Sequence, residues 1–139
     1  MIGEGASAGR VLGLVPARAG SQGLPGKNVR PLAGRPMVAW TLKACREASV
    51  LDQVVVSTDD PHVAEVATEM GLPPPFRRPD HLSGPQASVI DAVAHALETL
   101  GGTWDYVVLL QPTSPLRLGA DIDAAVRLCH DSGASAVIG

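Results

Sequence analysis

The sequence predicts an α/β fold with a mainly parallel, doubly wound sheet and right-handed crossovers. Short apolar runs alternate along the chain with longer stretches whose apolar residues recur at helical spacing. Hydrophobic residues make up 45% of the 139 residues but aromatic residues only 3%, so Val, Leu, Ile and Ala must build the core. That composition is typical of buried parallel strands covered by Ala-rich helices.

Four strands are expected. Residues 11–15 and 106–110 are continuous apolar runs, which are typical of strands buried on both faces. Residues 53–57 are dense in β-branched valines, which favour strands. Residues 134–138 are expected to form a further strand just before the last residue.

Four helices are expected between and after these strands. Asp60 suits the N-cap of the second and Pro61 its first turn, with Gly71 as its stop. Ser88 begins the third, whose apolar face includes Ile90 and Leu97. The expected helical ranges are 37–48, 61–70, 88–100 and 121–130, and the Pro-rich segment 72–86 is expected to be irregular.

The expected organisation is a loose tail over residues 1–10 and one domain over residues 11–139. The chain stops just after a strand with no helix to cover it, so the domain is expected to be truncated. Cys45 and Cys129 fall inside expected helices without Cys-x-x-Cys spacing and are interpreted as buried reduced thiols.

Composition and charge also limit the classes of binding partner that we expect. The formal net charge of −3 gives no reason to expect nucleic acid or an anionic membrane as partner. No apolar run approaches the roughly 20 residues that span a bilayer, and the N-terminus lacks the pattern of a signal peptide. We therefore expect a cytoplasmic protein that acts on small molecules.

The candidate site follows from the fold. In doubly wound sheets, ligands bind beyond the carboxyl ends of the strands. This rule predicts that residues 16–28, 57–60 and 111–117 surround one crevice.

The loop after the first strand has the composition of a phosphate-binding loop. Gly20, Gly23 and Gly26 permit close approach of the backbone, and Arg18 and Lys27 supply positive charge. The spacing excludes a Walker A loop, because five residues separate Gly20 from Gly26 and Asn follows the lysine, and it also departs from the dinucleotide fingerprint. A Gly-rich surface loop with scattered charges is the alternative at this point.

Other polar residues have simpler interpretations. Asp59 and Asp60 are interpreted as a turn residue and an N-cap, with a metal pair as the alternative. Ser114 has no visible base partner, which argues against nucleophilic catalysis. Trp40 and Trp104 are interpreted as core or interface residues, and the four histidines, His62, His81, His95 and His130, as structural or surface residues.

Four stretches together carry a resemblance to a known family. They are residues 14–28, Val55-Val56-Ser57-Thr58-Asp59, Arg77-Arg78-Pro79 and residues 109–117. The first resembles the CTP-binding signature of the acylneuraminate (sialic acid) cytidylyltransferases, and the other three follow in matching order and spacing. The resemblance covers nearly the whole chain from residue 11 and implies a Rossmann-like nucleotidyltransferase fold.

The resemblance implies that the protein transfers CMP from CTP to the hydroxyl of an acidic sugar and releases pyrophosphate, with Mg²⁺. A homodimer is possible, but the family's dimer-forming insertion would lie after residue 139, so the oligomeric state stays open. Arg18 and Lys27 would be the catalytic residues, and Gln111 and Arg117 would contact the acceptor. The implied CTP contacts are Leu14, Pro16, Ala17, Arg18, Ser21, Gln22, Gly23, Lys27, Asn28, Arg78 and Ser88.

The sequence departs from the family pattern at Gln22, where many relatives carry a lysine, and at Val89, where some carry a serine. The aspartates that hold the metal in this family would lie after residue 139, so the metal ligands stay unknown.

The sequence leaves open which acid is the acceptor. Sialic acid, legionaminate, 3-deoxy-octulosonate and a phosphonate such as phosphonoformate are the alternatives. Two other functions also stay open: a non-catalytic CTP-binding module, and a nucleotidyltransferase that uses a purine nucleotide.

Overall fold

A parallel sheet with β1 (Val11–Ala17) at its centre forms the core of the protein. The structure, a computed structural model, describes residues 10–19, 27–84, 88–112 and 118–133. Within these ranges β4 (Gln53–Thr58) pairs with one edge of β1 and β5 (Tyr106–Leu109) with the other, both in parallel. Every residue of β1 is buried, which explains why its sequence is a continuous apolar run.

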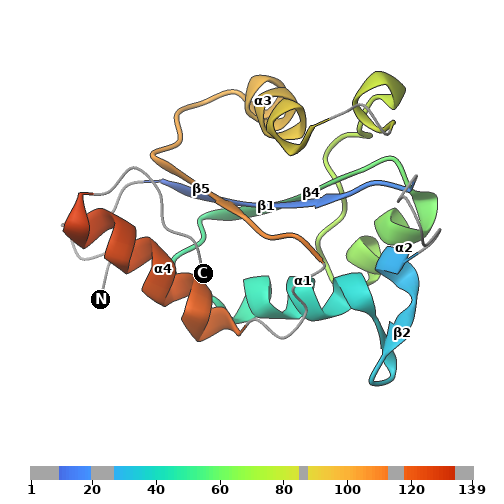
Figure 1. Ribbon diagram of the computed structural model, residues 1–139, viewed down its shortest axis with the longest axis horizontal. Coiled ribbons are helices and arrows are strands. Elements are labelled where there is room, and N and C mark those ends of the chain that lie inside the picture. Colours follow the sequence, from blue (N-terminus) through green and yellow to red (C-terminus); the bar gives the residue numbers. More distant parts are fainter. Residues whose placement is uncertain (1–9, 20–26, 85–87, 113–117, 134–139) are drawn as a thin grey trace.

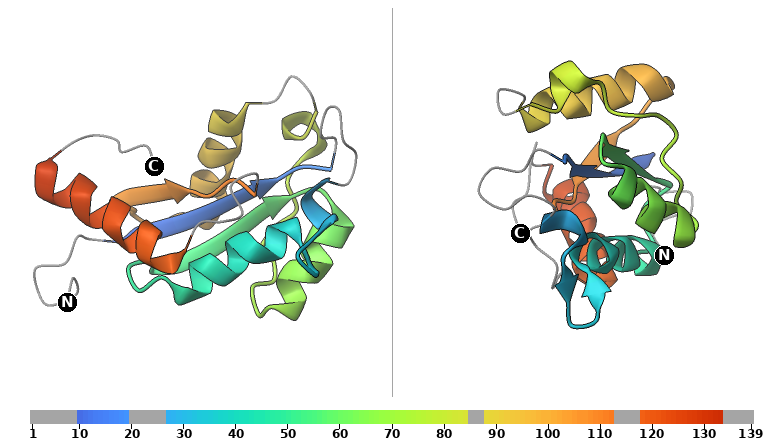
Figure 2. Two further views of the ribbon diagram at one scale, coloured as in Figure 1. Left: turned by 60° about the horizontal axis from the view of Figure 1, so that its bottom comes forward. Right: turned by 90° about the vertical axis from the view of Figure 1, so that its right-hand side faces the viewer.

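Helices cover both faces of the sheet (Figures 1 and 2). Three of them, α1 (Met37–Glu47), α2 (Pro61–Glu69) and α4 (Gly119–Ser132), lie on one face, and α3 (Val89–Leu100) lies on the other. Alternate residues of β1 serve the two layers: Val11 and Val15 belong to the α1 side, and Leu12 and Leu14 to the α3 side. The predicted doubly wound α/β class is therefore confirmed.

A small hairpin was not predicted. Residues Pro31–Leu32 (β2) and Arg35–Pro36 (β3) pair in antiparallel fashion, and the hairpin projects from the body beside α1 (Figure 1). Its two-residue turn has Ala33 at φ 50° and Gly34 at φ 84°, the left-handed region that tight hairpin turns require. Alanine seldom adopts this conformation, so the Ala-Gly pair gave no turn signal.

Two further short helices, η1 (Lys27–Val29) and η2 (Asp80–Leu82), were also unexpected. The predicted N-cap is confirmed, because the Asp60 side chain accepts a hydrogen bond from the backbone N–H of His62 at 2.9 Å. The expected strand over 134–138 lies outside the described residues.

The prediction for the apolar face of α3 was wrong at Ile90, whose side chain is 69% exposed. The buried positions are Ala92 and Ala96, and Val93 and Leu97 pack beside them against the sheet. Small alanines let the helix approach closely and shift its contact face away from Ile90. Cys45 is buried as expected, whereas Cys129 is only partly buried.

The junction of α4 with the end of α1 depends on two residues. A Cβ atom on Gly119 would lie 2.7 Å from the backbone carbon of Glu47, so only glycine fits there without a shift. The Asp123 carboxylate accepts hydrogen bonds from the backbone N–H groups of Ser49 and Val50 and from the Ser49 hydroxyl, at 2.8 to 3.1 Å. These contacts hold the turn after α1 against α4.

None of the helices in the described ranges is both long and apolar enough to cross a bilayer.

Candidate functional site

A hollow of about 220 Å³ opens at the carboxyl ends of β1 and β5. The chain passes from β1 to β4 on one side and later to β5 on the other, so the strand order β4-β1-β5 reverses between β1 and β5. Such a switch point is where doubly wound sheets bind their ligands. The hollow is lined by Pro16, Arg18, Arg78, Val89 and Gln111.

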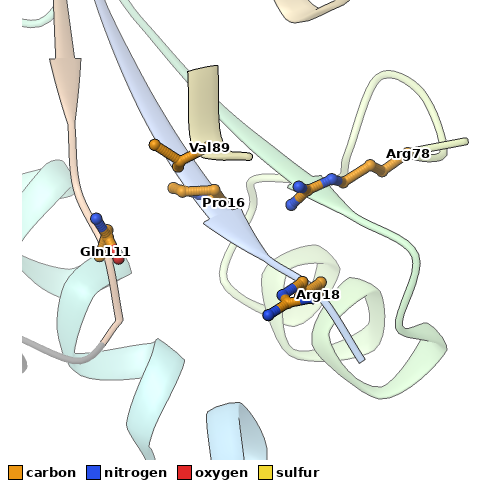
Figure 3. A pocket seen from close by; sticks show the side chains of 5 residues that line it. All are labelled: Pro16, Arg18, Arg78, Val89 and Gln111. Carbon is orange, nitrogen blue, oxygen red and sulfur yellow. The ribbon is translucent and has the colours of Figure 1, made fainter. Parts of the chain in front are cut away.

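Figure 3 shows how separate elements supply these side chains. Pro16 lies near the end of β1 and Arg18 directly after it, while Gln111 follows β5. Arg18 and Arg78 lie on one side of the hollow and Gln111 on the other, with Pro16 and Val89 between them. The hollow thus has a cationic side, an apolar floor and an amide facing the cations.

Arg18 is held by its side chain and by its main chain. Its guanidinium Nη1 donates a hydrogen bond to the carbonyl of Gly84 at 2.7 Å. The Thr58 hydroxyl donates to the carbonyl of Ala17, the Asn28 amide donates to the carbonyl of Arg18 at 3.3 Å, and the N–H of Ala19 donates to the Asp59 carboxylate at 2.8 Å. The backbone on both sides of Arg18 is therefore fixed.

Arg78 is 3% exposed, which is unusual for an arginine. Its backbone N–H donates to the carbonyl of Thr58 at 2.9 Å, and its Nε donates to the carbonyl of Leu82 at 2.7 Å. Burial lowers the pKa of Arg78 below its ordinary value; Asp59 opposes that shift and Arg18 adds to it. Because a guanidinium stays charged in proteins, Arg78 is a buried cation.

The two guanidiniums make the hollow positive. In the described ranges neither forms an ion pair within salt-bridge distance; the pairs there are Lys43–Glu47 and Arg77–Asp80, both at the surface. A guanidinium has five N–H donors, and the contacts above use one on each side chain. A buried guanidinium beside a half-buried one, with no carboxylate within salt-bridge distance of either in the described ranges, favours a bound anion, and the planar forks suit phosphate or carboxylate oxygens.

A second, larger hollow of about 500 Å³ lies at the start of α2. Its lining includes two carboxylates, Asp59 and Asp60, one cation, Arg77, and the apolar side chains of Pro61, Pro74 and Phe76, so negative charges outnumber positive ones there. Carboxylates repel phosphate, so the smaller hollow is the better candidate for an anionic ligand.

The structure brings together four of the predicted site residues, Pro16, Arg18, Arg78 and Gln111. Four others lie near the hollow without lining it. Leu14 and Ala17 are buried in β1, the buried Asn28 holds the main chain of Arg18, and the Ser88 hydroxyl accepts from the N–H of Asp91 at 3.2 Å as the N-cap of α3. The predicted residues Ser21, Gln22, Gly23 and Arg117, and the side chain of Lys27, lie outside the described part of the structure.

Sequence reasoning missed two contributors to the site. Asp59 was interpreted as a turn residue, and the carbonyl of Gly84, which accepts from Arg18, was not considered. The pairing register of β1 with β4 would have indicated that Asp59 lies beside the residues that follow β1. Ala17 lies opposite Thr58, so the residues that follow each strand leave the sheet side by side.

A metal centre is not formed by the described residues. No group of three His, Cys, Asp or Glu side chains suited to a metal ion occurs among them. The two aspartates that line the larger hollow are already engaged, Asp60 with the start of α2 and Asp59 with Ala19. Asp59 and Asp60 are therefore not assigned as metal ligands.

Comparison with known proteins finds a family model and relatives that match most of the chain. Residues 12–137 match the model of the family described as Cytidylyltransferase. CMP-N,N'-diacetyllegionaminic acid synthase of Legionella pneumophila is 41% identical over 131 residues, which cover 92% of this chain and 56% of that protein. N-acylneuraminate cytidylyltransferase of Escherichia coli is 34% identical over 119 residues, which cover 86% of this chain and 28% of that protein.

A solved structure also resembles the chain. It is a CMP:2-keto-3-deoxy-manno-octonic acid synthetase complexed with CTP, with a TM-score of 0.75 and 25% sequence identity. The match covers 90% of this chain and 49% of that one. The chain thus spans about half, or less, of the length of these relatives.

Proposed function

Because the chain belongs to the cytidylyltransferase family, we propose that it binds CTP and transfers CMP to the hydroxyl of a sugar acid, with release of pyrophosphate. The observation that carries the proposal is the hollow at the switch point, which Arg18 and Arg78 both line and where, among the described residues, neither has a carboxylate within salt-bridge distance. Gln111 faces them from the end of β5 (Figure 3).

In the proposed reaction the acceptor hydroxyl attacks the α-phosphorus of CTP. The new bond joins the acceptor oxygen to that phosphorus, while the acceptor O–H bond breaks and its proton passes to solvent. The bond from the α-phosphorus to the oxygen that bridges to the β-phosphorus breaks, so that pyrophosphate leaves in line. Such a transfer needs little covalent chemistry from the protein; positioning and neutralisation of charge supply most of the acceleration. The two guanidiniums of Arg18 and Arg78, at the carboxyl ends of the strands, can provide both positioning and neutralisation of charge.

Within this proposal, Arg18 neutralises phosphate charge, because its backbone is anchored on both sides and its side chain is oriented by Gly84. Arg78, in the segment between α2 and η2, contacts the nucleotide from the same side of the hollow as Arg18. Gln111 offers an amide that can donate to and accept from the acceptor acid.

Further roles rest on the family resemblance. Lys27 is a catalytic residue that stabilises the leaving pyrophosphate, and Ser88 contacts the ribose. Arg117 contacts the acceptor. The remaining predicted CTP contacts are Leu14, Pro16, Ala17, Ser21, Gln22, Gly23 and Asn28.

We propose a sialic-acid-like sugar acid as the acceptor. The names of the two relatives above refer to legionaminic acid and N-acylneuraminate, which are both acidic sugars of this class. The matched structure is of an enzyme for a different sugar acid, 2-keto-3-deoxy-manno-octonic acid. The acceptor test must therefore include that acid and phosphonoformate beside the sialic-acid-like sugars.

Mg²⁺ as cofactor, a homodimer and a cytoplasmic location complete the proposal. A bound divalent cation would neutralise charge on the triphosphate. Light scattering of the purified chain tests the dimer, and CTP binding measured with and without EDTA tests the need for a divalent cation.

The activity is tested by incubating the chain with CTP, Mg²⁺ and each acid in turn, and by measuring pyrophosphate together with the CMP-ester. Product with a sialic-acid-like sugar supports the proposal. Tight CTP binding without product from any acid supports the non-catalytic CTP-binding module instead. A chain that is stabilised against thermal unfolding by ATP or GTP more than by CTP contradicts both.

A further inference from the structure

Asp59 has a role that capping of α2 does not explain. The adjacent Asp60 is the N-cap of α2, since its carboxylate accepts from the N–H of His62. The Asp59 carboxylate instead accepts from the N–H of Ala19, which is 40 positions away in the sequence. Ala19 directly follows Arg18 and is the first residue of the loop predicted to bind phosphate.

The contact is part of a set of three that surrounds Arg18. We call the side chains of Thr58, Asn28 and Asp59 the Arg18 anchors. They bind, in order, the carbonyl of Ala17, the carbonyl of Arg18 and the N–H of Ala19. Asn28 and Asp59 both hold the peptide group that joins Arg18 to Ala19, Asn28 through its carbonyl and Asp59 through its N–H, so together they fix the direction in which the chain leaves β1.

The charge of Asp59 makes its position informative. A carboxylate beside an anion site weakens anion binding through Coulomb repulsion, and Asp59 is near enough to Arg78 to raise the pKa of that residue. A negative group here opposes the ligand that the two arginines attract. Its benefit must therefore be geometric, and a hydrogen bond from a backbone N–H to a carboxylate is a strong one.

We propose that Asp59 is a positioning residue for the nucleotide site: its hydrogen bond to Ala19 holds Arg18 toward the hollow and sets the start of the phosphate-binding loop. This inference rests on the proposed function. Asp59 acts through the main chain of Arg18 and Ala19, so an uncharged oxygen acceptor at the same place performs the same task.

Two substitutions separate the hydrogen bond from the charge. Asp59→Asn keeps an oxygen acceptor and removes the charge, whereas Asp59→Ala removes both. Asp80→Ala is the matched control, because Asp80 is an exposed aspartate whose carboxylate pairs at the surface with Arg77 at 3.1 Å. Thermal unfolding of each variant establishes that it is folded.

The first measurement is amide exchange at Ala19, followed by NMR in the nucleotide-free chain. Exchange is expected to accelerate in Asp59→Ala and to stay close to wild type in Asp59→Asn and Asp80→Ala. The second is CTP affinity by calorimetry. Loss of a hydrogen bond to a charged acceptor predicts about a tenfold rise in Kd for Asp59→Ala, and a change of about threefold or less for the other two.

Two results overturn the positioning role. One is an Asp59→Ala variant with wild-type exchange at Ala19 and wild-type CTP affinity. The other is an Asp59→Asn variant as impaired as Asp59→Ala, which would make the charge the essential property. If the wild-type chain itself does not bind CTP, the proposed function fails and the positioning role fails with it; normal CTP binding by wild type and Asp59→Ala alike defeats the positioning role alone.

Discussion

Replacing Arg78 with alanine is expected to weaken CTP binding strongly while the neighbouring Arg77→Ala leaves it unchanged. Both arginines lie in the same segment and carry the same charge. Arg78 is 3% exposed and lines the hollow, whereas Arg77 is exposed and pairs with Asp80 at the surface. The comparison therefore separates a contact in the site from a general effect of positive charge.

The magnitude follows from the position of Arg78. A unit charge about 4 Å from a phosphate oxygen gains roughly 4 kcal/mol at an effective dielectric near 20. Folding already buries Arg78 and thereby lowers its pKa. The cost of desolvating this guanidinium is therefore part of the folding free energy and does not reduce the affinity for the nucleotide. Competition from water and Mg²⁺ reduces the gain, so we expect a loss of about 2 to 3 kcal/mol, which is roughly a 30- to 150-fold rise in Kd.

Isothermal calorimetry with CTP at fixed ionic strength measures this loss. Arg78→Lys keeps the charge but lacks the Nε that donates to the carbonyl of Leu82, so an intermediate Kd is expected. Unfolding curves for Arg78→Ala and Arg78→Lys verify that the hollow is still formed. A Kd for Arg78→Ala within twofold of that for Arg77→Ala would refute the assignment of the hollow as the nucleotide site.

Four further predictions concern the loop and the scaffold. Lys27→Ala is expected to remove the thermal stabilisation that CTP gives, and an unchanged shift would count against the loop assignment. Asp123→Ala leaves the N–H groups of Ser49 and Val50 without their acceptor and is expected to cost about 2 to 4 kcal/mol in urea unfolding; a cost below about 0.5 kcal/mol would contradict it. Burial raises the pKa of Asp123. The hydrogen bonds from Ser49 and Val50 and the charge of Arg127 lower it by a larger amount, so the net shift of the pKa is downward. The stability this gives is present above the unfolded pKa near 3.9 and is lost as pH falls through the folded pKa, so the advantage of wild type over Asp123→Asn should shrink below about pH 4. Gly119→Ala is expected to lower the free energy of unfolding by about 1 to 3 kcal/mol, because the new Cβ would lie 2.7 Å from the backbone of Glu47. If the variant unfolds at the wild-type urea midpoint, α4 can shift away from α1 without cost and the prediction is wrong.

Much of the fold could be predicted because local pattern and tertiary role agree in it. β1 is buried on both faces, so its apolar run was sufficient to identify a central parallel strand. Asp60 and Pro61 begin α2 by local hydrogen bonding, which is readable from neighbouring residues alone. In both cases the determining contacts are close in sequence or depend only on burial.

The predictions that failed, at Ile90 and at the hairpin over residues 31–36, depend on contacts between distant residues or on an unusual backbone conformation. Ile90 lies on the same helical stripe as Leu97, but α3 approaches the sheet through Ala92 and Ala96, and that close approach depends on tertiary packing. The hairpin at 31–36 depends on a left-handed alanine, for which the sequence gives no signal.

The site shows the same division. Arg18 and Gln111 follow parallel strands whose carboxyl ends lie at the same end of the sheet. The expected topology was therefore sufficient to predict that the two side chains line one hollow. The neighbouring role of Asp59 needs the strand register and the identity of its distant partner, Ala19. Contacts of that kind arise from the folded chain and have no local signature.

The most direct measurement of the central claim is a crystal structure of the chain with CTP. We predict that the nucleotide occupies the hollow between the ends of β1 and β5, with Arg18 and Arg78 both in contact with it and Gln111 on the acceptor side. A nucleotide bound in the larger hollow at the start of α2, or elsewhere with Arg18 and Arg78 untouched, would contradict the account.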